Sequence, residues 1–194
     1  IDRLALYGID QQFISIKYLG EQLVSRFGNG VDKDINLQYV REEKPLGTIG
    51  SLKLVEDLLI HDIQLIMNSD LLTDNDFEAF YTDFINSGAD MAVASIPYEV
   101  NVPYGVLETE GKQIVALKEK PTYTYYCNAG IYFVKKEVIG LIPKNEHYNA
   151  TDLMEQLIAN GGKVVFFPIV GYWLDIGKHH DYEKAQQDIK KFKF

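Results

Sequence analysis

Two aspartates far apart in the sequence stand where a metal ion could bind. Asp70 follows the short apolar run at residues 63–67, and Asp175 lies between two apolar residues, just ahead of Gly177. Open α/β sheets bind ligands at the carboxyl ends of their strands, and Mg²⁺ prefers carboxylate oxygens. We therefore expect the two carboxylates to share one Mg²⁺. The alternative for each is an aspartate that only caps the adjacent backbone.

A lysine beside a proline is a candidate phosphate clamp. Lys118, Glu119 and Lys120 precede Pro121, and the residue before a proline is held extended. One charge pair at about 4 Å contributes about 4 kcal/mol at an effective dielectric constant near 20, before desolvation. The alternative is a charged strand face in water.

Small residues mark places where a ligand could approach the backbone closely. Gly47, between Leu46 and Thr48, forms a turn ahead of a predicted helix, where backbone amides attract anions or base edges. Gly105 and Gly130 follow an aromatic residue and an Asn-Ala pair, respectively. Such glycines are more often part of an ordinary turn or bulge, so each signal by itself is weak. No His/Cys spacing predicts a transition-metal site.

The elements that must position these residues alternate in the first half of the chain. Strand patterns at residues 12–18, 36–40 and 63–67 alternate with helix patterns at 20–27, 48–59 and 75–88. Residues 63–67 have the pattern of a buried parallel strand. This alternation predicts a parallel sheet with helices on both faces.

Strands dominate the second half. They are predicted at residues 89–96, 104–109, 113–118, 128–134 and 163–167, with antiparallel pairing through the Glu110-Gly111 turn and helices at 150–160 and 180–191. We therefore predict a Rossmann-like, three-layer αβα fold around a mixed, mostly parallel sheet. We expect residues 1–194 to form one domain, with a change of role near residue 97 and no domain boundary there.

Composition narrows the function classes. The 194 residues carry a net charge of −9 and a single cysteine, which disfavours nucleic acid and anionic membranes as partners and excludes an internal disulfide. The apolar runs are too short to span a bilayer, and no signal peptide is visible, so we expect a cytoplasmic protein. Ile1 begins in the middle of a helix pattern, which predicts an N-terminally truncated chain.

Six short motifs occur in an order that resembles the sugar-phosphate nucleotidyltransferases, also called NDP-sugar pyrophosphorylases. They are Leu46-Gly47-Thr48-Ile49-Gly50-Ser51-Leu52, Asn68-Ser69-Asp70, Pro103-Tyr104-Gly105-Val106, Glu119-Lys120-Pro121, Asn128-Ala129-Gly130-Ile131-Tyr132 and Tyr172-Trp173-Leu174-Asp175-Ile176-Gly177. The motifs cover essentially the whole chain and are most similar to the bacterial mannose-1-phosphate guanylyltransferase-like branch.

The resemblance implies a Mg²⁺-dependent reaction in which an NTP and a sugar 1-phosphate give an NDP-sugar and pyrophosphate. It implies that Asp70 and Asp175 bind the metal, that Lys120 grips the sugar phosphate and that Glu119 accepts hydrogen bonds from sugar hydroxyls. It further implies a sugar pocket lined by Gly105, Asn128, Gly130 and Trp173, and a nucleotide site formed by Leu46, Gly47, Thr48 and Ser69.

Three departures from the family pattern affect the expected activity. No Gly-x-Gly-x-Arg segment, which wraps the triphosphate in the family, occurs in these 194 residues, so we expect this chain to be inactive or nearly so. Ser69 replaces the usual glycine and stands near the ribose. Lys118 replaces an acidic residue and adds positive charge beside the phosphate clamp.

Glu42 is the candidate for choosing the base. A carboxylate only accepts hydrogen bonds, and guanine offers adjacent N1–H and N2–H₂ donors where uracil and thymine offer one N3–H. GTP is therefore weakly favoured as the nucleotide. The chain is also compatible with a homo-oligomer. Two alternatives stay open. One is a non-catalytic sensor of sugar phosphates or NDP-sugars. The other is a nucleotide-sugar-dependent glycosyltransferase, although Asn68 stands where that class would have the first residue of Asp-x-Asp.

Overall fold

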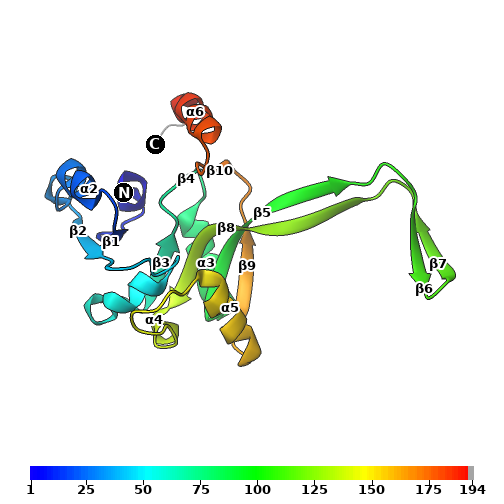
Figure 1. Cartoon of the computed structure of the whole chain (residues 1–194), viewed down its shortest axis with the longest axis horizontal. Helices are drawn as coiled ribbons and strands as arrows, with labels where there is room; N and C mark the ends of the chain where they lie inside the picture. The colour runs from blue at the N-terminus through cyan, green and yellow to red at the C-terminus, as the bar shows by residue number, and fades with distance from the viewer. Residues whose placement is uncertain (192–194) are drawn as a thin grey trace.

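A mixed four-stranded sheet forms the centre of the molecule, which a computed structural model describes for residues 1–191 (Figure 1). Its strands lie in the order β3 (Ile63–Met67), β8 (Thr122–Lys135), β5 (Met91–Asn101) and β9 (Val164–Pro168). β8 pairs antiparallel with β3 and with β5, whereas β5 and β9 are parallel. Parallel pairing is therefore less extensive in this sheet than the sequence predicts.

Helices cover both faces of this sheet. On one face, α3 (Phe77–Ser87) packs its phenylalanines against alanines and aromatic residues of β5 and β8. On the other face, α4 (Lys136–Ile139) and α5 (Ala150–Ala159) bury a second apolar cluster. Fully buried side chains such as Phe80 and Leu153 anchor the two layers. The predicted three-layer α/β arrangement with a mixed central sheet is confirmed.

A separate parallel pair stands beside this sheet. β1 (Gln11–Ile16) pairs with β2 (Asn36–Arg41), with α2 (Gly20–Phe27) and the short 3₁₀ helix η1 (Val31–Lys33) between them in the sequence. A groove lined by residues 6–11 and 61–65 separates β1 from β3. Consequently β3 is an edge strand whose five residues are all only half-buried, not the fully buried strand that its sequence predicts.

The predicted helix over residues 48–59 is replaced by two 3₁₀ helices, η2 (Gly50–Leu54) and η3 (Glu56–Leu58). The backbone N–H groups of Ile49 and Gly50 both donate to the Tyr148 carbonyl, at 3.2 and 3.1 Å. This tie to a distant segment fixes the start of the turn. The apolar spacing identifies the buried face correctly but does not distinguish 3₁₀ from α geometry.

The C-terminal elements form one edge of the molecule. β4 (Leu71–Thr73) pairs antiparallel with β10 (Trp173–Asp175), which is followed by α6 (His179–Asp188) and η4 (Ile189–Lys191). The Tyr172 hydroxyl donates to Asp188 at 2.7 Å and so ties α6 to the segment leading into β10. At the other end of the chain, α1 (Asp2–Leu6) contacts the start of α3 through an Arg3 hydrogen bond to the Asn75 carbonyl.

A long two-stranded arm projects from the central sheet (Figure 1). β5 and β8 stay paired as far as Asn101 and Thr122, well beyond the residues that pair with β3 and β9. Beyond them lies the hairpin of β6 (Val106–Glu110) and β7 (Gln113–Lys118), which confirms the predicted turn at Glu110-Gly111. β5 runs through Pro97, where a strand end was predicted, because Pro97 lies beyond β9 on a free edge that needs no N–H donor.

Within residues 1–191, no helix combines the length and apolar character needed to cross a bilayer.

Candidate functional site

The ladder between β4 and β10 brings Asp70 and Asp175 together. Asp175 lies directly opposite Leu71, and the backbone N–H of Ile176 donates to the carbonyl of Asp70 at 2.8 Å. The two aspartates are thus one register position apart on adjacent chain segments, and both are exposed to solvent. Residues more than a hundred positions apart in sequence therefore meet at one edge of the molecule, as predicted.

The carboxylates at this edge could bind Mg²⁺ only together with ligands from outside the chain. Asp175 Oδ1 accepts a hydrogen bond from the Gly177 N–H at 2.8 Å, which orients the carboxylate. No group of three or more His, Cys, Asp or Glu side chains suited to a metal ion occurs among the described residues. Mg²⁺ is commonly held by one or two carboxylates together with substrate phosphates and water. Asp70 and Asp175 could therefore hold the ion with a bound nucleotide, but not as a closed protein cage.

Gly130 fits tightly against Asn68 next to this edge. Its backbone has φ +73°, and a Cβ there would lie 2.7 Å from Asn68 Nδ2. The N–H of Asn68 donates to the Gly130 carbonyl at 2.9 Å, which continues the β3–β8 ladder past Met67. Glycine is required here because of this contact and the left-handed backbone.

Asn128 and Trp173 are held by the same irregular part of β8. The register with β5 shifts between Val93 and Ser95, and such bulges often re-aim side chains next to active sites. Asn128 Oδ1 accepts from the Gly130 N–H and its Nδ2 donates to the Tyr132 hydroxyl, both at 2.9 Å. The Trp173 indole N–H donates to the Ala129 carbonyl at 2.9 Å. Asn68, Asn128, Gly130, Trp173 and the two aspartates thus form one connected group, which we call the aspartate edge.

Glu42, the predicted base-selecting residue, is engaged by the protein itself. Its Oε2 accepts from the Leu46 N–H at 2.9 Å, and its Oε1 accepts from the Ser15 hydroxyl. The carboxylate therefore closes the turn from residue 42 to residue 46. A base would have to use the lone pairs that these two hydrogen bonds leave.

The Leu46-Gly47-Thr48 turn is joined to the start of α5. The Thr48 hydroxyl accepts from the Ala150 N–H at 2.8 Å, and the Thr48 N–H donates to Asn149 Oδ1 at 3.3 Å. A Cβ on Gly47 would lie 2.6 Å from the Tyr148 carbonyl oxygen. Gly47 is therefore required for a close backbone contact, and Thr48 has a structural task whether or not it also meets a base.

The predicted sugar-phosphate residues near the hairpin lie together, on the arm. A Cβ on Gly105 would lie 3.0 Å from Glu119 Oε2. Lys120 has φ +44°, so the residue before Pro121 is not held extended as predicted. A positive φ is uncommon outside glycine and often marks functional sites. Lys118 is paired with Glu108 at 2.5 Å, and this hydrogen bond raises the pKa of its ammonium. The charge of Lys118 is thus directed to Glu108 and not to a ligand at Lys120.

Lys120 is separated from the two aspartates by the arm, so the residues expected to bind the metal and the sugar phosphate do not lie together in this structure. Six positions of continuous strand separate Thr122 from Asn128, which corresponds to about 20 Å. Asn128 belongs to the aspartate edge, whereas Lys120 lies beyond Thr122 at the far end of the arm. The sequence pattern predicts separate strands at residues 113–118 and 128–134, whereas β8 begins at Thr122 and runs without a break to Lys135.

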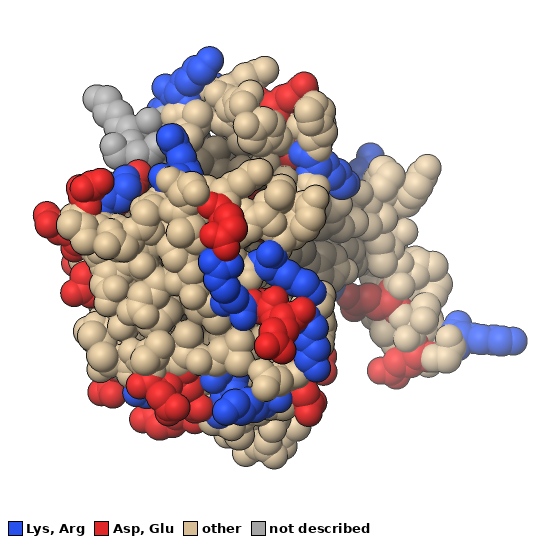
Figure 2. Space-filling view, turned by 60° about the vertical axis from the view of Figure 1, so that its left-hand side comes forward, with Lys and Arg blue, Asp and Glu red and all other residues tan. Residues whose placement is uncertain are grey.

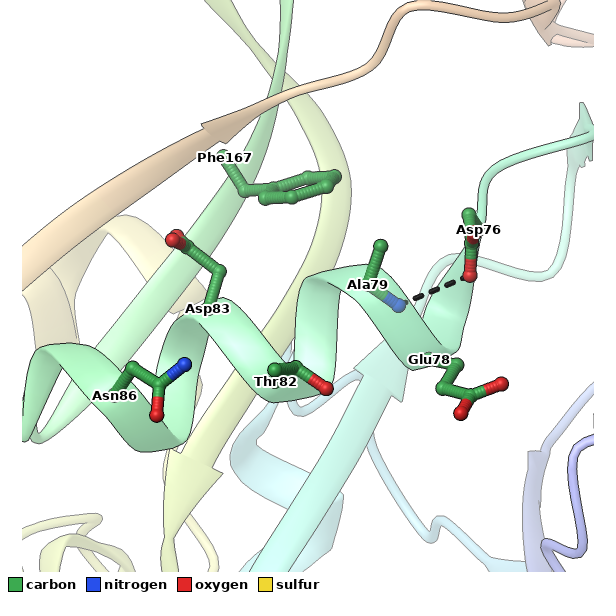
Figure 3. Close-up of a pocket in the computed structure, with 7 residues that line it drawn as sticks. All are labelled: Asp76, Glu78, Ala79, Thr82, Asp83, Asn86 and Phe167. Carbon is green, nitrogen blue, oxygen red and sulfur yellow. Dashed lines mark hydrogen bonds between the residues drawn. The ribbon is translucent and has the colours of Figure 1, made fainter.

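The hollow along α3 is not part of this group (Figure 3). It is lined by Asp76, Glu78, Ala79, Thr82, Asp83, Asn86 and Phe167. Figure 3 shows the carboxylate of Asp83 on the side of the helix that faces Phe167, and Asp76 accepting a hydrogen bond from the Ala79 N–H at the helix start. Three carboxylates would repel a phosphate, so we do not place the nucleotide there.

Two partners in these contacts were missed by sequence reasoning. Asn68 is part of the motif that ends in Asp70, and its fit against Gly130 depends on the β3–β8 pairing. Asn149 carries a recognisable signal, because Asn149 and Asp152 form a capping box at the start of α5. Its contact with Thr48, 101 positions away, has no local signal in the sequence.

Comparison with known proteins gives a family match over nearly the whole chain. The family model described as nucleotidyl transferase matches residues 1–191. A D-glycero-α-D-manno-heptose 1-phosphate guanylyltransferase of Aneurinibacillus thermoaerophilus is 29% identical over 95% of this chain and 80% of its own length. A mannose-1-phosphate guanylyltransferase of Mycobacterium tuberculosis is 27% identical over 97% of this chain and 54% of its own. The chain thus spans about half the length of several curated relatives.

Solved structures share the fold. A putative glucose-1-phosphate thymidylyltransferase from Bacillus anthracis, in complex with a sucrose, superposes with a TM-score of 0.75 at 22% identity, covering 100% of this chain and 81% of that one. HddC from Yersinia pseudotuberculosis gives a TM-score of 0.72 at 21% identity, covering 97% and 82% of the two chains.

Proposed function

Because this chain belongs to the nucleotidyl transferase family, we propose that the protein transfers a nucleotidyl group from an NTP to a sugar 1-phosphate. An oxygen of the sugar phosphate attacks the α-phosphorus, the bond from that phosphorus to the oxygen bridging to the β-phosphate breaks, and pyrophosphate leaves as the NDP-sugar forms. The observation that carries this proposal is the β4–β10 register, which sets Asp70 beside Asp175 at one edge. Catalysis of this kind depends on positioning and charge neutralisation.

We assign Asp70 and Asp175 to Mg²⁺ binding. When bound, the ion supplies positive charge against the phosphates during the displacement. The chain's own contribution is to bring the backbones of the two residues into adjacent register, with Asp175 Oδ1 oriented by the Gly177 N–H. Both carboxylates are solvent-exposed, so a nucleotide phosphate can complete the coordination.

The sugar 1-phosphate is assigned to the strand between the aspartate edge and the arm. Asn128, Gly130 and Trp173 form the part nearest Asp70, tied together by hydrogen bonds along the β8 bulge. Glu119, with Gly105 against it, would accept hydrogen bonds from sugar hydroxyls, and Lys120 would pair with the phosphate. For Lys120 to act on the same substrate, the arm must curl toward the aspartate edge when ligand binds.

The nucleotide is assigned to the turn at residues 46–48, with Ser69 near the ribose. We favour GTP because the two relatives described above are guanylyltransferases. Glu42 fixes the turn through the Leu46 N–H and does not by itself favour one base. On this proposal residues 1–96 serve the nucleotide and residues 97–194 serve the sugar phosphate. Since NTPs are substrates, the reaction belongs in the cytoplasm.

One observation favours the sensor alternative for the 194-residue chain itself. These residues contain no Gly-x-Gly-x-Arg segment to wrap a triphosphate. We therefore expect this chain to bind a GDP-sugar through the aspartate edge but to turn over slowly or not at all.

A pyrophosphate-release assay on the full-length protein tests the proposal. GTP, UTP, dTTP and CTP are each combined with several sugar 1-phosphates, with and without Mg²⁺, and the NDP-sugar is quantified by chromatography. We expect one NDP-sugar per pyrophosphate, with GTP preferred. Binding of an NDP-sugar with no pyrophosphate from any combination would support a sensor. Consumption of an NDP-sugar with transfer to another acceptor would identify a glycosyltransferase.

A further inference from the structure

The β4–β10 ladder that sets the backbones of Asp70 and Asp175 side by side is very short. It runs from Trp173 opposite Thr73 to Asp175 opposite Leu71, three residue pairs in all, and forms a two-stranded sheet of its own (Figure 1). A two-stranded ribbon is marginally stable by itself in water. The register of β10 against β4 therefore depends on contacts beyond these three pairs.

A shift of one residue in this register would separate the two aspartates. Side chains alternate between the faces of a strand, so such a shift turns every side chain of β10 to the opposite face relative to β4. Leu174 or Ile176 would then stand opposite Leu71 in place of Asp175. Whatever fixes the register of β10 thus also fixes where the carboxylate of Asp175 is presented.

Asp74, directly after β4, holds the backbone of the residue that precedes β10. Its Oδ1 accepts a hydrogen bond from the Tyr172 N–H, and its own N–H donates to the Tyr172 carbonyl at 3.1 Å. The Thr73 hydroxyl donates to the same carbonyl at 2.8 Å, and Thr73 is only 5% exposed. Both backbone groups of Tyr172 are therefore bound by one short segment at the end of β4.

The carboxylate of Asp74 also fits closely against Gly171. A Cβ on Gly171 would lie 2.0 Å from Asp74 Oδ1 and 2.8 Å from its Cγ, far inside van der Waals contact. The φ of Gly171 lies outside the left-handed region, so glycine is needed here for space and not for an unusual backbone. Val170, one residue earlier, is 96% exposed and gives β10 no packed anchor.

Two other contacts hold this segment, but they run to elements other than β4. The Trp173 indole N–H donates to the Ala129 carbonyl of β8, and the Tyr172 hydroxyl donates to Asp188 of α6. Both act at the tips of long aromatic side chains. Asp74, in contrast, binds the backbone of Tyr172 from the end of β4 itself, so its contact sets the register between these two strands.

We propose that Asp74 is a positioning residue for the metal site, because its contacts with Gly171 and Tyr172 set the register in which Asp175 stands beside Asp70. Asp74 lies four positions from Asp70, about 13 Å along an extended chain, and so acts without touching the ion. The inference rests on the proposed function, since it takes Asp70 and Asp175 as the Mg²⁺ ligands. A looser register lowers the affinity of this pair for the ion.

Luminescence of bound Tb³⁺, another ion that prefers oxygen ligands, measures this affinity on the 194-residue chain without turnover. Figure 2 shows acidic side chains at several separate places on the surface, so the ion also binds elsewhere. Trp173 is the only tryptophan and stands two positions from Asp175. Selective excitation of tryptophan therefore reports Tb³⁺ near the aspartates, and Asp175→Asn should abolish this signal.

Two substitutions of Asp74 separate its shape from its charge. Asp74→Ala should weaken the tryptophan-sensitised binding of Tb³⁺ about tenfold, the usual order of loss for a partner that supports metal ligands. Asp74→Asn should restore most of the affinity, because its amide oxygen can still accept from the Tyr172 N–H. Gly171→Ala makes the same test from the other side of the contact, since its methyl group displaces the carboxylate.

Asp76→Ala is the matched control. Asp76 Oδ1 accepts from the Ala79 N–H at 3.0 Å at the start of α3, so the substitution removes a similar hydrogen bond two positions away and lowers stability without touching β10. It should leave the Tb³⁺ affinity unchanged. In the full-length protein, Asp74→Ala should raise the Mg²⁺ concentration for half-maximal pyrophosphate release about tenfold, with turnover at saturating Mg²⁺ close to wild type.

The outcomes distinguish this inference from the proposed function. Wild-type Tb³⁺ affinity in folded Asp74→Ala or Gly171→Ala would overturn the inference. Equal losses in Asp74→Ala and Asp76→Ala would also overturn it, because general destabilisation would then explain both. If Asp175→Asn keeps the tryptophan-sensitised signal, or wild type releases no pyrophosphate with any NTP, the proposed function itself is wrong.

Discussion

A side chain at position 130 would collide with Asn68, so Gly130→Ala tests how rigid the aspartate edge is. The variant combines a left-handed backbone with a Cβ 2.7 Å from Asn68 Nδ2. We expect a loss of about 2–4 kcal/mol in the free energy of unfolding. Gly88→Ala is the control, since Gly88 has φ +64° with nothing within 4 Å; it should lose only about 1 kcal/mol. If urea denaturation shows equal losses in the free energy of unfolding for both variants, Asn68 moves aside at little cost and the contact is not rigid.

Asp90 makes stability depend on acid pH. The Lys163 N–H and then the Lys135 ammonium, both at 2.9 Å, hold the pKa of Asp90 below its ordinary value of 3.8. A lowered folded-state pKa adds stability that is present above pH 3.8 and is lost as pH falls through the folded value. Asp90→Asn should therefore be less stable than wild type at neutral pH, with the difference shrinking below about pH 4. A difference in the free energy of unfolding that stays constant across this pH range would show that Asp90 does not cause the pH dependence.

Thr48 joins the turn at residues 46–48 to the start of α5. Substitutions there distinguish a structural role of this residue from a role in ligand binding. Thr48→Val removes the hydroxyl that accepts from the Ala150 N–H at 2.8 Å. Loss of such a helix-start partner should lower the free energy of unfolding by about 1–2 kcal/mol, whereas Thr48→Ser should keep it. If the turn contacts the base of the nucleotide, Thr48→Val should also weaken GTP binding, measured under conditions in which the variant is fully folded. Unchanged GTP affinity would confine Thr48 to a structural role.

The arm must move if Lys120 is to share a substrate with Asp70. In a Cys127→Ser background that keeps Lys120, spin labels at Lys112→Cys, in the turn between β6 and β7, and at Asp57→Cys report the distance between the end of the arm and the body. Adding a GDP-sugar with Mg²⁺ should shorten that distance, because the phosphate would attract Lys120 and the metal would bind at the aspartates. An unchanged distance at saturating ligand would exclude Lys120 from the aspartate site of its own chain.

How far the sequence could predict this molecule depends on the range of the interactions involved. Local patterns predicted α3, α5 and the hairpin at Glu110-Gly111, because apolar spacing and turn residues are local. The motif order predicted that Asp70 and Asp175 share one site, and the β4–β10 register places the two residues on adjacent chain segments. The pattern could not show the course of the arm, since strand alternation from Ile96 to Asn101 is the same in a straight and a curled ribbon. Nor could it show that β3 would lie at an open edge.

The central claim concerns the whole molecule: Asp70 and Asp175 together serve nucleotidyl transfer. The most direct test is pyrophosphate release by the full-length protein with GTP, mannose 1-phosphate and Mg²⁺, comparing wild type with Asp70→Asn and Asp175→Asn. Asp83→Asn is the control, because this exposed carboxylate lies in the hollow along α3. We predict that each of the first two variants stays folded and loses at least about a hundredfold in turnover, while Asp83→Asn keeps wild-type turnover. Wild-type turnover in both Asp70→Asn and Asp175→Asn would contradict the account.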